Sequence, residues 1–126
     1  MTMNAYEARK MANDHYLNKI YSDIEDFASQ GYYDFSMPLK RFIKCKPEIV
    51  VNELIEDGYK LLFLLDGEFD YEGVIDDFNQ EDRKFQPINI NSLDDYNNAL
   101  MVIDEYAKKY ELENFAQKWA RIKISW

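Results

Sequence analysis

The chain has little of several residue types on which common functional sites depend. Its 126 residues include one cysteine, one histidine, four glycines and three prolines. The single cysteine, Cys45, permits no internal disulfide and fits a reducing compartment. Together with His15 it supplies too few nitrogen and sulfur ligands for a zinc centre, so we expect no metal site of that kind. The separated glycines provide no Gly-rich loop for binding phosphate groups.

Long apolar runs are also missing. The longest, at residues 61–65, has five residues, far fewer than the roughly 18 that a membrane helix needs. The first twenty residues are of mixed charge and helical in pattern, so we expect neither a secretory signal nor a transit peptide. These features predict a cytoplasmic protein without a membrane-spanning segment.

Basic residues are scarce relative to acidic ones. The chain has 15 lysines and arginines against 24 aspartates and glutamates, a net charge of -9. Binding to nucleic acid through phosphates requires a basic patch, and membrane surfaces are anionic as well. We therefore expect no direct contact with nucleic acid or membrane, and favour a protein partner with a basic surface.

Apolar residues, in contrast, are sufficient for a core, at 47% of the chain, and the length fits a single domain over residues 1–126. A first helix is predicted from Asn4, which can cap it with Glu7, to a stop at Gly31. A helix of this length exceeds what a small domain needs. Its N-terminal turns are therefore candidates for contact with a second copy of the chain. The inward stripe predicted for this helix comprises Ala5, Ala8, Ala12, Tyr16, Ile20, Ile24 and Phe27.

Two further helices and several strands follow from periodicity. The second helix should begin at Pro47 and end at Gly58, and the third should begin at Ser92 with Asp95 completing its cap. The stretch LKRFIKCK at residues 39–46 is interpreted as a basic surface loop or short helix. Alternation predicts a strand at residues 32–37, with Tyr33, Phe35 and Met37 on one face, and an edge strand at residues 85–90. It also predicts a terminal strand with Ala120, Ile122, Ile124 and Trp126 on one face and Trp119, Arg121, Lys123 and Ser125 on the other.

The stretch YKLLFLLDGEFDYEGVI at residues 59–75 predicts a β-hairpin. Asp66 and Gly67 suit a two-residue type I′ turn, which would place Leu61 opposite Glu72. Leu62, Leu64, Phe69 and Tyr71 would then form one apolar face, and Leu61, Phe63 and Leu65 would share the other with Glu68, Asp70 and Glu72. We therefore predict an α+β fold: a long N-terminal helix and two further helices packed on a small, mostly antiparallel sheet containing a 60–75 hairpin.

Four short segments resemble a group of small, uncharacterised bacteriophage proteins. They are NAYEARK at residues 4–10, the helix stop before a short strand at residues 31–35, ELIEDGYK at residues 53–60 and IKISW at residues 122–126. Members of the group typically join an N-terminal "EARK" helix through an "LGYKV" element to a terminal "ISW" strand. The resemblance implies a phage accessory protein, and small acidic phage proteins are often inhibitors of host machinery, including anti-CRISPR and antirestriction proteins. Most members are shorter, so the stretch from Asp66 to about Lys118 resembles an enlargement of their pattern.

The acidic segment is the main candidate site. Its alternating acids resemble a calcium loop, but Tyr71 stands where glycine is needed and Asp77 where a bidentate glutamate is needed. We interpret the segment instead as a protein-binding surface, balanced in part by Arg121 and Lys123. The acidic residues proposed for binding are Glu68, Asp70, Glu72, Asp76, Asp77, Glu81 and Asp82, and the apolar or aromatic ones are Leu61, Phe63, Leu65 and Tyr71.

No residue pattern singles out catalysis. His15 and Cys45 lack a marked partner that would orient them, and no pair of carboxylates stands out for hydrolysis. We expect a non-enzymatic protein without cofactors that binds a host protein in the host cytoplasm. One alternative is an oligomeric protein that sequesters a small molecule or nucleotide, and another is a phage structural or assembly component. For a nucleotide, the nearest basic cluster is Arg41, Lys44 and Lys46, and the tyrosines that fit the apolar stripes least are Tyr6, Tyr21, Tyr32 and Tyr59.

Overall fold

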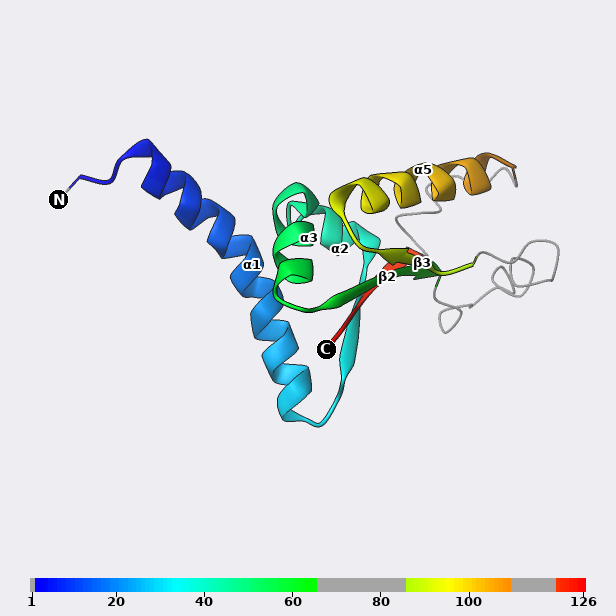
Figure 1. Cartoon of the computed structure of the whole chain (residues 1–126), viewed down its shortest axis with the longest axis horizontal. Helices are drawn as coiled ribbons and strands as arrows, with labels where there is room; N and C mark the ends of the chain where they lie inside the picture. The colour runs from blue at the N-terminus through cyan, green and yellow to red at the C-terminus, as the bar shows by residue number, and fades with distance from the viewer. Residues whose placement is uncertain (1, 66–85, 110–119) are drawn as a thin grey trace.

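The computed structural model describes residues 2–65, 86–109 and 120–126, and within them helices pack on an antiparallel sheet (Figure 1). The helices are α1 (Ala5–Ser29), α2 (Leu39–Ile43), α3 (Pro47–Glu56) and α5 (Leu93–Lys109). The strands are β1 (Asp34–Pro38), β2 (Lys60–Leu65), β3 (Ile88–Ile90) and β4 (Ala120–Ser125). The predicted α+β class and the long N-terminal helix are confirmed.

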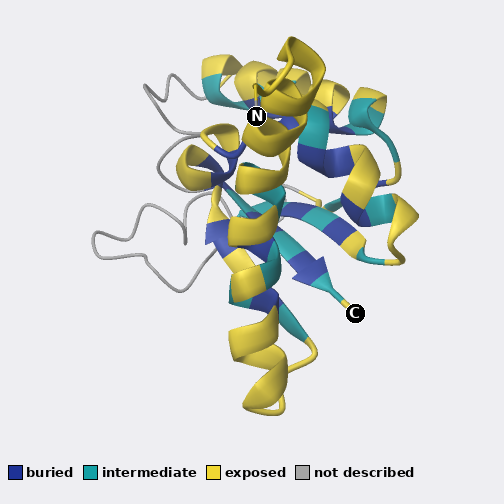
Figure 2. Cartoon of the chain, turned by 90° about the vertical axis from the view of Figure 1, so that its left-hand side faces the viewer, coloured by how far each residue is buried: buried dark blue, intermediate teal, exposed yellow. Residues whose placement is uncertain are grey.

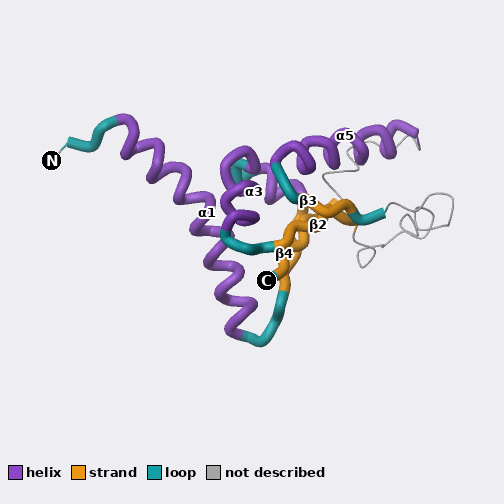
Figure 3. The backbone as a smooth tube through the Cα atoms, viewed as in Figure 1, coloured by secondary structure: helices purple, strands orange, loops and turns teal. Residues whose placement is uncertain are grey.

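The sheet has the strand order β1-β4-β2-β3, and each neighbouring pair is antiparallel. The last strand of the chain, β4, therefore lies between β1 and β2. Figure 3 shows the strands as one group beside α3 and α5. In one row across the sheet, Ile124 pairs with Phe35 on one side and with Leu61 on the other. Leu61 in turn pairs with Ile90. This row lies in the core, because all four side chains are buried.

One face of the sheet supplies most of the strand residues in the core. Successive residues of a strand point to opposite faces, and β4 alternates strictly between buried and partly buried residues, as predicted. Each of the four described helices contacts at least one strand. The residues buried from the sheet are Phe35, Met37, Leu61, Phe63, Ile90, Ala120, Ile122 and Ile124.

The helix starts predicted from capping residues are present. The Asn4 side-chain oxygen accepts a hydrogen bond from the Glu7 amide at 2.8 Å, and the Asn4 side-chain nitrogen donates to the Glu7 carboxylate at 3.2 Å. The Ser92 hydroxyl accepts from the Asp95 amide at 3.1 Å. After α1, Gly31 has a φ of +90°, which favours glycine and allows the chain to turn into β1.

The stretch interpreted as a basic surface contributes to the core as well. Leu39 and Phe42, three residues apart on α2, are both fully buried. Burying each of these side chains stabilises the fold by about 1.5–3 kcal/mol. Five residues are too few to display a helical period, so the sequence pattern did not reveal this inward face.

The strand pairing predicted for the hairpin is wrong at residues 61–63. Leu61, Leu62 and Phe63 pair with β4 along one edge of β2 and with β3 along the other. Both edges are therefore occupied at these positions, and Leu61 cannot also pair with Glu72. The Asp66-Gly67 turn itself lies outside the described residues. Tyr33 is a second correction: its side chain is 77% exposed because β1 begins only at Asp34.

Candidate functional site

Most of the predicted acidic surface lies outside the described residues. This applies to Glu68, Asp70, Tyr71, Glu72, Asp76, Asp77, Glu81 and Asp82. Their role in binding stays a prediction. The strands that flank this segment along the chain, β2 and β3, are neighbours in the sheet.

The apolar residues assigned to the same surface belong elsewhere. Leu61 and Phe63 are 3% and 0% exposed and lie in the core, and Leu65 is partly buried against it. The physical reason is the pairing of β2 with both β3 and β4, which turns these side chains toward the helices. Leu61 and Phe63 are thus not available as surface contacts in this fold.

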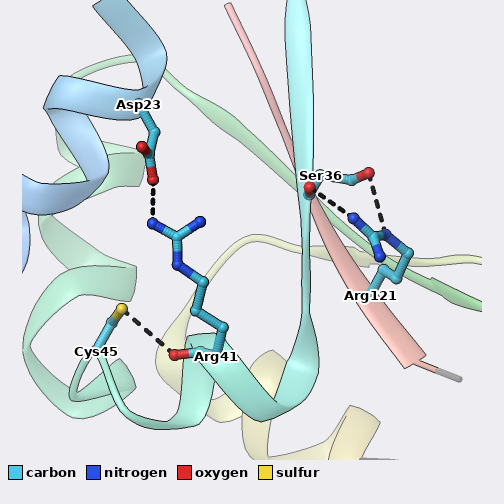
Figure 4. Close-up of polar contacts among 5 residues, drawn as sticks. All are labelled: Asp23, Ser36, Arg41, Cys45 and Arg121. Carbon is cyan, nitrogen blue, oxygen red and sulfur yellow. Dashed lines mark hydrogen bonds and ion pairs between the residues drawn. The ribbon is translucent and has the colours of Figure 1, made fainter. Parts of the chain in front are cut away.

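Arg121 and Lys123, predicted to balance the acidic ladder, lie on the sheet face opposite the core. The Arg121 guanidinium donates to the Ser36 hydroxyl at 3.2 Å and to the Ser36 carbonyl at 2.8 Å (Figure 4). Lys123 forms an ion pair with Asp34 at 3.5 Å. Both basic side chains therefore interact with β1, the neighbouring strand, whereas any contact with the acidic segment lies outside the described residues.

The first half of α1, together with residues 2–4 before it, forms an arm, defined here as residues 2–15. Every residue of the arm is exposed, and in Figure 1 this part of the helix extends away from the rest of the molecule. Figure 2 shows the same stretch as continuously exposed. Large apolar side chains on it include Met3, Tyr6 and Met11, which are 54%, 69% and 61% exposed.

The apolar stripe predicted for α1 is not buried as one face. Ile20 and Ile24 are the buried residues of the helix, whereas Ala8 and Ala12 are exposed. With 3.6 residues per turn, the group Ala8, Met11, Ala12 and His15 points about 150° away from Ile20 and Ile24 around the helix axis. The two halves of α1 therefore present apolar residues in different directions, and only the second half faces the core.

A hollow of about 450 Å³ lies between α1 and the α2 segment. We call it the α1–α2 pocket. Its lining residues are Tyr16, Lys19, Ile20, Ser22, Asp23, Arg41, Lys44 and Cys45. Three of them are cations and one is a carboxylate, so the pocket is positive in a chain whose net charge is -9.

Two contacts order one wall of this pocket. The Arg41 guanidinium forms an ion pair with Asp23 of α1 at 2.5 Å, and the Cys45 thiol donates to the Arg41 carbonyl at 3.4 Å (Figure 4). Burial raises the pKa of the Cys45 thiol, while the nearby charges of Arg41 and Lys19 oppose that rise. Cys45 therefore stays a protonated thiol at neutral pH, which is a poor nucleophile.

The sequence indicated two of the three pocket cations, Arg41 and Lys44, but not Lys19. Tyr16, Lys19 and Asp23 are spaced three and four residues apart, so they lie on one face of a helix. This spacing is the sequence signal that could have placed Lys19 beside Tyr16 and Asp23. What the sequence lacked was the position of α2, which places Arg41 against this face of α1.

A second hollow of about 450 Å³ lies between α1 and α3. Its charged lining residues are Arg9, Lys10, Asp14 and Glu53, so it has no net charge. Farther along the same two helices, the Tyr21 hydroxyl donates to the Asp57 carboxylate. Burial first, and then this hydrogen bond to a carboxylate, raise the pKa of Tyr21.

In the part of the chain that the structure describes, no three His, Cys, Asp or Glu side chains group closely enough to hold a metal ion. Within residues 2–65, 86–109 and 120–126, no helix has the length and apolar character that crossing a membrane requires. The fold and these sites define an α+β protein with two features suited to binding, the arm and the α1–α2 pocket. No protein-family model, curated protein or solved structure matches the chain.

Proposed function

We propose that this chain is a non-enzymatic binding protein that contacts a protein partner through its arm. The observation that carries the proposal is the exposure of every residue from 2 to 15, of which residues 5–15 belong to a helix that extends from the body of the fold. The arm belongs to the 25-residue helix α1, whose buried residues, Ile20 and Ile24, both lie in its second half. A partner that packs against the arm would bury the large apolar side chains that this stretch exposes.

The chemistry of the arm suits a protein interface. Tyr6 and Met11 are large, strongly exposed side chains, and tyrosine and methionine are enriched where proteins bind one another. The charges on this stretch, Glu7, Arg9, Lys10 and Asp14, cancel. The arm therefore offers apolar and aromatic contact without net charge.

The charge of the whole chain supports a basic partner. Residues 66–85 contain eight carboxylates and two basic residues, which accounts for -6 of the net charge of -9. An acidic surface accelerates association with a basic protein. Given the resemblance to small bacteriophage proteins, we propose that the partner is a host protein, such as a component of CRISPR or restriction machinery, met in the host cytoplasm.

The test uses the intact chain with an affinity tag in bacterial lysate, over a series of salt concentrations. We expect recovery of a basic protein at low salt and its loss at high salt. The affinity of that protein is then measured for Tyr6→Ala and Met11→Ala. Each should weaken binding by about tenfold, as expected for an interface residue worth more than 1 kcal/mol.

Met101→Ala on α5 is the matched control, because Met101 is 61% exposed, as is Met11. It should bind like the unmodified chain. Recovery of no basic protein at any salt, or equal affinities for Met11→Ala and Met101→Ala, would overturn the proposal. A dimer in sedimentation that Met11→Ala dissociates would show that the arm binds a second copy, and would overturn the assignment to a host protein.

A second candidate function is sequestration of a nucleotide. The α1–α2 pocket favours it, because this hollow combines three basic side chains with the Tyr16 ring. The residues that line this pocket begin at Tyr16 and so do not include Tyr6 or Met11 of the arm, and the two functions can be tested with different variants.

A further inference from the structure

The α1–α2 pocket combines positive charge, an aromatic ring and a partly apolar lining. We propose that it binds a nucleotide, with Lys19, Arg41 and Lys44 contacting the phosphate group and Tyr16 the base. Its volume of about 450 Å³ falls within the roughly 300–1,000 Å³ typical of small-molecule sites. This inference rests on the second candidate function, sequestration of a nucleotide, and is independent of the proposed binding of a protein by the arm.

The charge of the pocket identifies the class of ligand. Lys19 and Lys44 form no ion pair within the described residues, and both are exposed. Screening limits the reach of a charge to about 8–10 Å at physiological salt, so a ligand in the pocket interacts mainly with the charges that line it, three cations and the Asp23 carboxylate. An anion is therefore attracted to this site despite the negative charge of the whole chain.

The Arg41 side chain is ordered in a position where it can bind a phosphate group. Its ion pair with Asp23 fixes the guanidinium between the two helices (Figure 4). A guanidinium has five N–H donors in a rigid plane, and the contact with Asp23 uses one of its terminal nitrogens. Its geometry matches phosphate oxygens, which makes arginine well suited to phosphate recognition. Because Arg41 is 53% exposed at the side chain, a ligand can reach it.

The apolar part of the pocket lining is where we place the base of the nucleotide. Ile20 and Cys45, which are 1% and 7% exposed, form the most buried part of the lining. Tyr16 is partly buried beside them, and its ring meets that of His15 edge to face at 5.4 Å. Aromatic side chains bind nucleobases by stacking, with little preference among bases. The pocket therefore predicts preference for a nucleotide over inorganic pyrophosphate, which has no base to contact Tyr16.

The test is calorimetric titration of the full chain with adenosine monophosphate and, separately, with inorganic pyrophosphate. Adenosine monophosphate should bind more tightly. Lys19→Gln and Lys44→Gln should each weaken its binding by about tenfold, the loss expected for one charged hydrogen bond. Lys40→Gln is the matched control: Lys40 lies on α2 and is exposed, but does not line the pocket. It should change the affinity less than twofold.

A fourth variant tests the ring. Tyr16→Leu should weaken binding of adenosine monophosphate and leave binding of pyrophosphate unchanged, with circular dichroism showing that the helix content of the chain is unaltered. The proposal is overturned if adenosine monophosphate shows no binding at millimolar concentration, or if Lys19→Gln and Lys44→Gln behave like Lys40→Gln. Equal affinity for pyrophosphate would overturn the assignment of Tyr16 to the base. None of these results bears on binding by the arm, so the two proposals can fail independently.

Discussion

Tyr96 places a polar atom, its hydroxyl oxygen, in the hydrophobic core. The residue is 3% exposed, and its ring packs against Phe42 with centroids 5.5 Å apart. Its hydroxyl is buried without a hydrogen-bond partner within the described residues. Burial, with a smaller effect from the charge of Glu48, raises the pKa of Tyr96 to about 12. The ring therefore stabilises the core, while the hydroxyl opposes that effect.

Tyr96→Phe should leave the free energy of unfolding unchanged or raise it, by up to about 1–3 kcal/mol, because an unsatisfied buried hydroxyl is removed. Urea denaturation measures this as a higher midpoint at constant slope. Tyr32→Phe is the control, since Tyr32 is 55% exposed and should be neutral. A clear fall in stability for Tyr96→Phe alone would mean that the hydroxyl has a partner.

The effect of Tyr96→Phe on the free energy of unfolding should also depend on pH. The folded-state pKa of Tyr96, about 12, lies above the ordinary value of about 10. Stability that depends on the protonated hydroxyl is thus present below pH 10 and lost as the pH rises through 12. The gap between Tyr96→Phe and the unmodified chain should therefore widen above pH 10.

At the scale of elements, two helix caps of similar chemistry have different surroundings. Asn4 caps α1 at the arm, where no residue from 2 to 15 is buried. Ser92 caps α5, whose Tyr96, Ala99 and Ile103 are buried. A cap contributes to global stability only where its helix unfolds together with the core.

Ser92→Ala should lower the free energy of unfolding by about 1 kcal/mol, the usual effect of losing a cap. Asn4→Ala should leave it nearly unchanged, but should accelerate amide hydrogen exchange in the first turns of α1. Urea denaturation and exchange measured by NMR separate the two effects. Equal losses of global stability would show that the arm unfolds with the core.

Predictability from sequence also differed between elements. The long helices were predicted because caps and periodicity agree over many residues, and the terminal strand because its alternation is strict. The pairing of β2 with β4 was not predicted. The turn signal at Asp66-Gly67 indicates a partner strand that follows directly in the sequence, and it carries no information about β4. The short helix α2 gave too few residues for a period, so Leu39 and Phe42 were not recognised as core.

For the whole molecule, the distribution of charge is the property to test. The four acids Asp76, Asp77, Glu81 and Asp82 are part of the predicted acidic surface. Replacing all four by their amides should slow association with the basic partner by about tenfold at low salt and have little effect at high salt, because charge at a surface mainly controls the association rate. Surface plasmon resonance measures both rates.

The matched control replaces four exposed acids on helices, Glu25, Asp26, Asp104 and Glu105. Both sets change the net charge from -9 to -5. If the two variants slow association equally, net charge alone controls the rate and the acidic segment is not the binding surface.

The amino-acid sequence by itself determined the class of the fold, most of its elements and the excess of negative charge. These properties follow from composition, caps and periodicity, which act over a few residues. Only the tertiary structure decided that Leu61 and Phe63 are core residues, that the arm is exposed, and that Lys19 and Arg41 line one pocket. The reason is physical: β4 inserts between β1 and β2, and α2 packs near the second half of α1. Such contacts join residues far apart in the chain, and no local pattern specifies them.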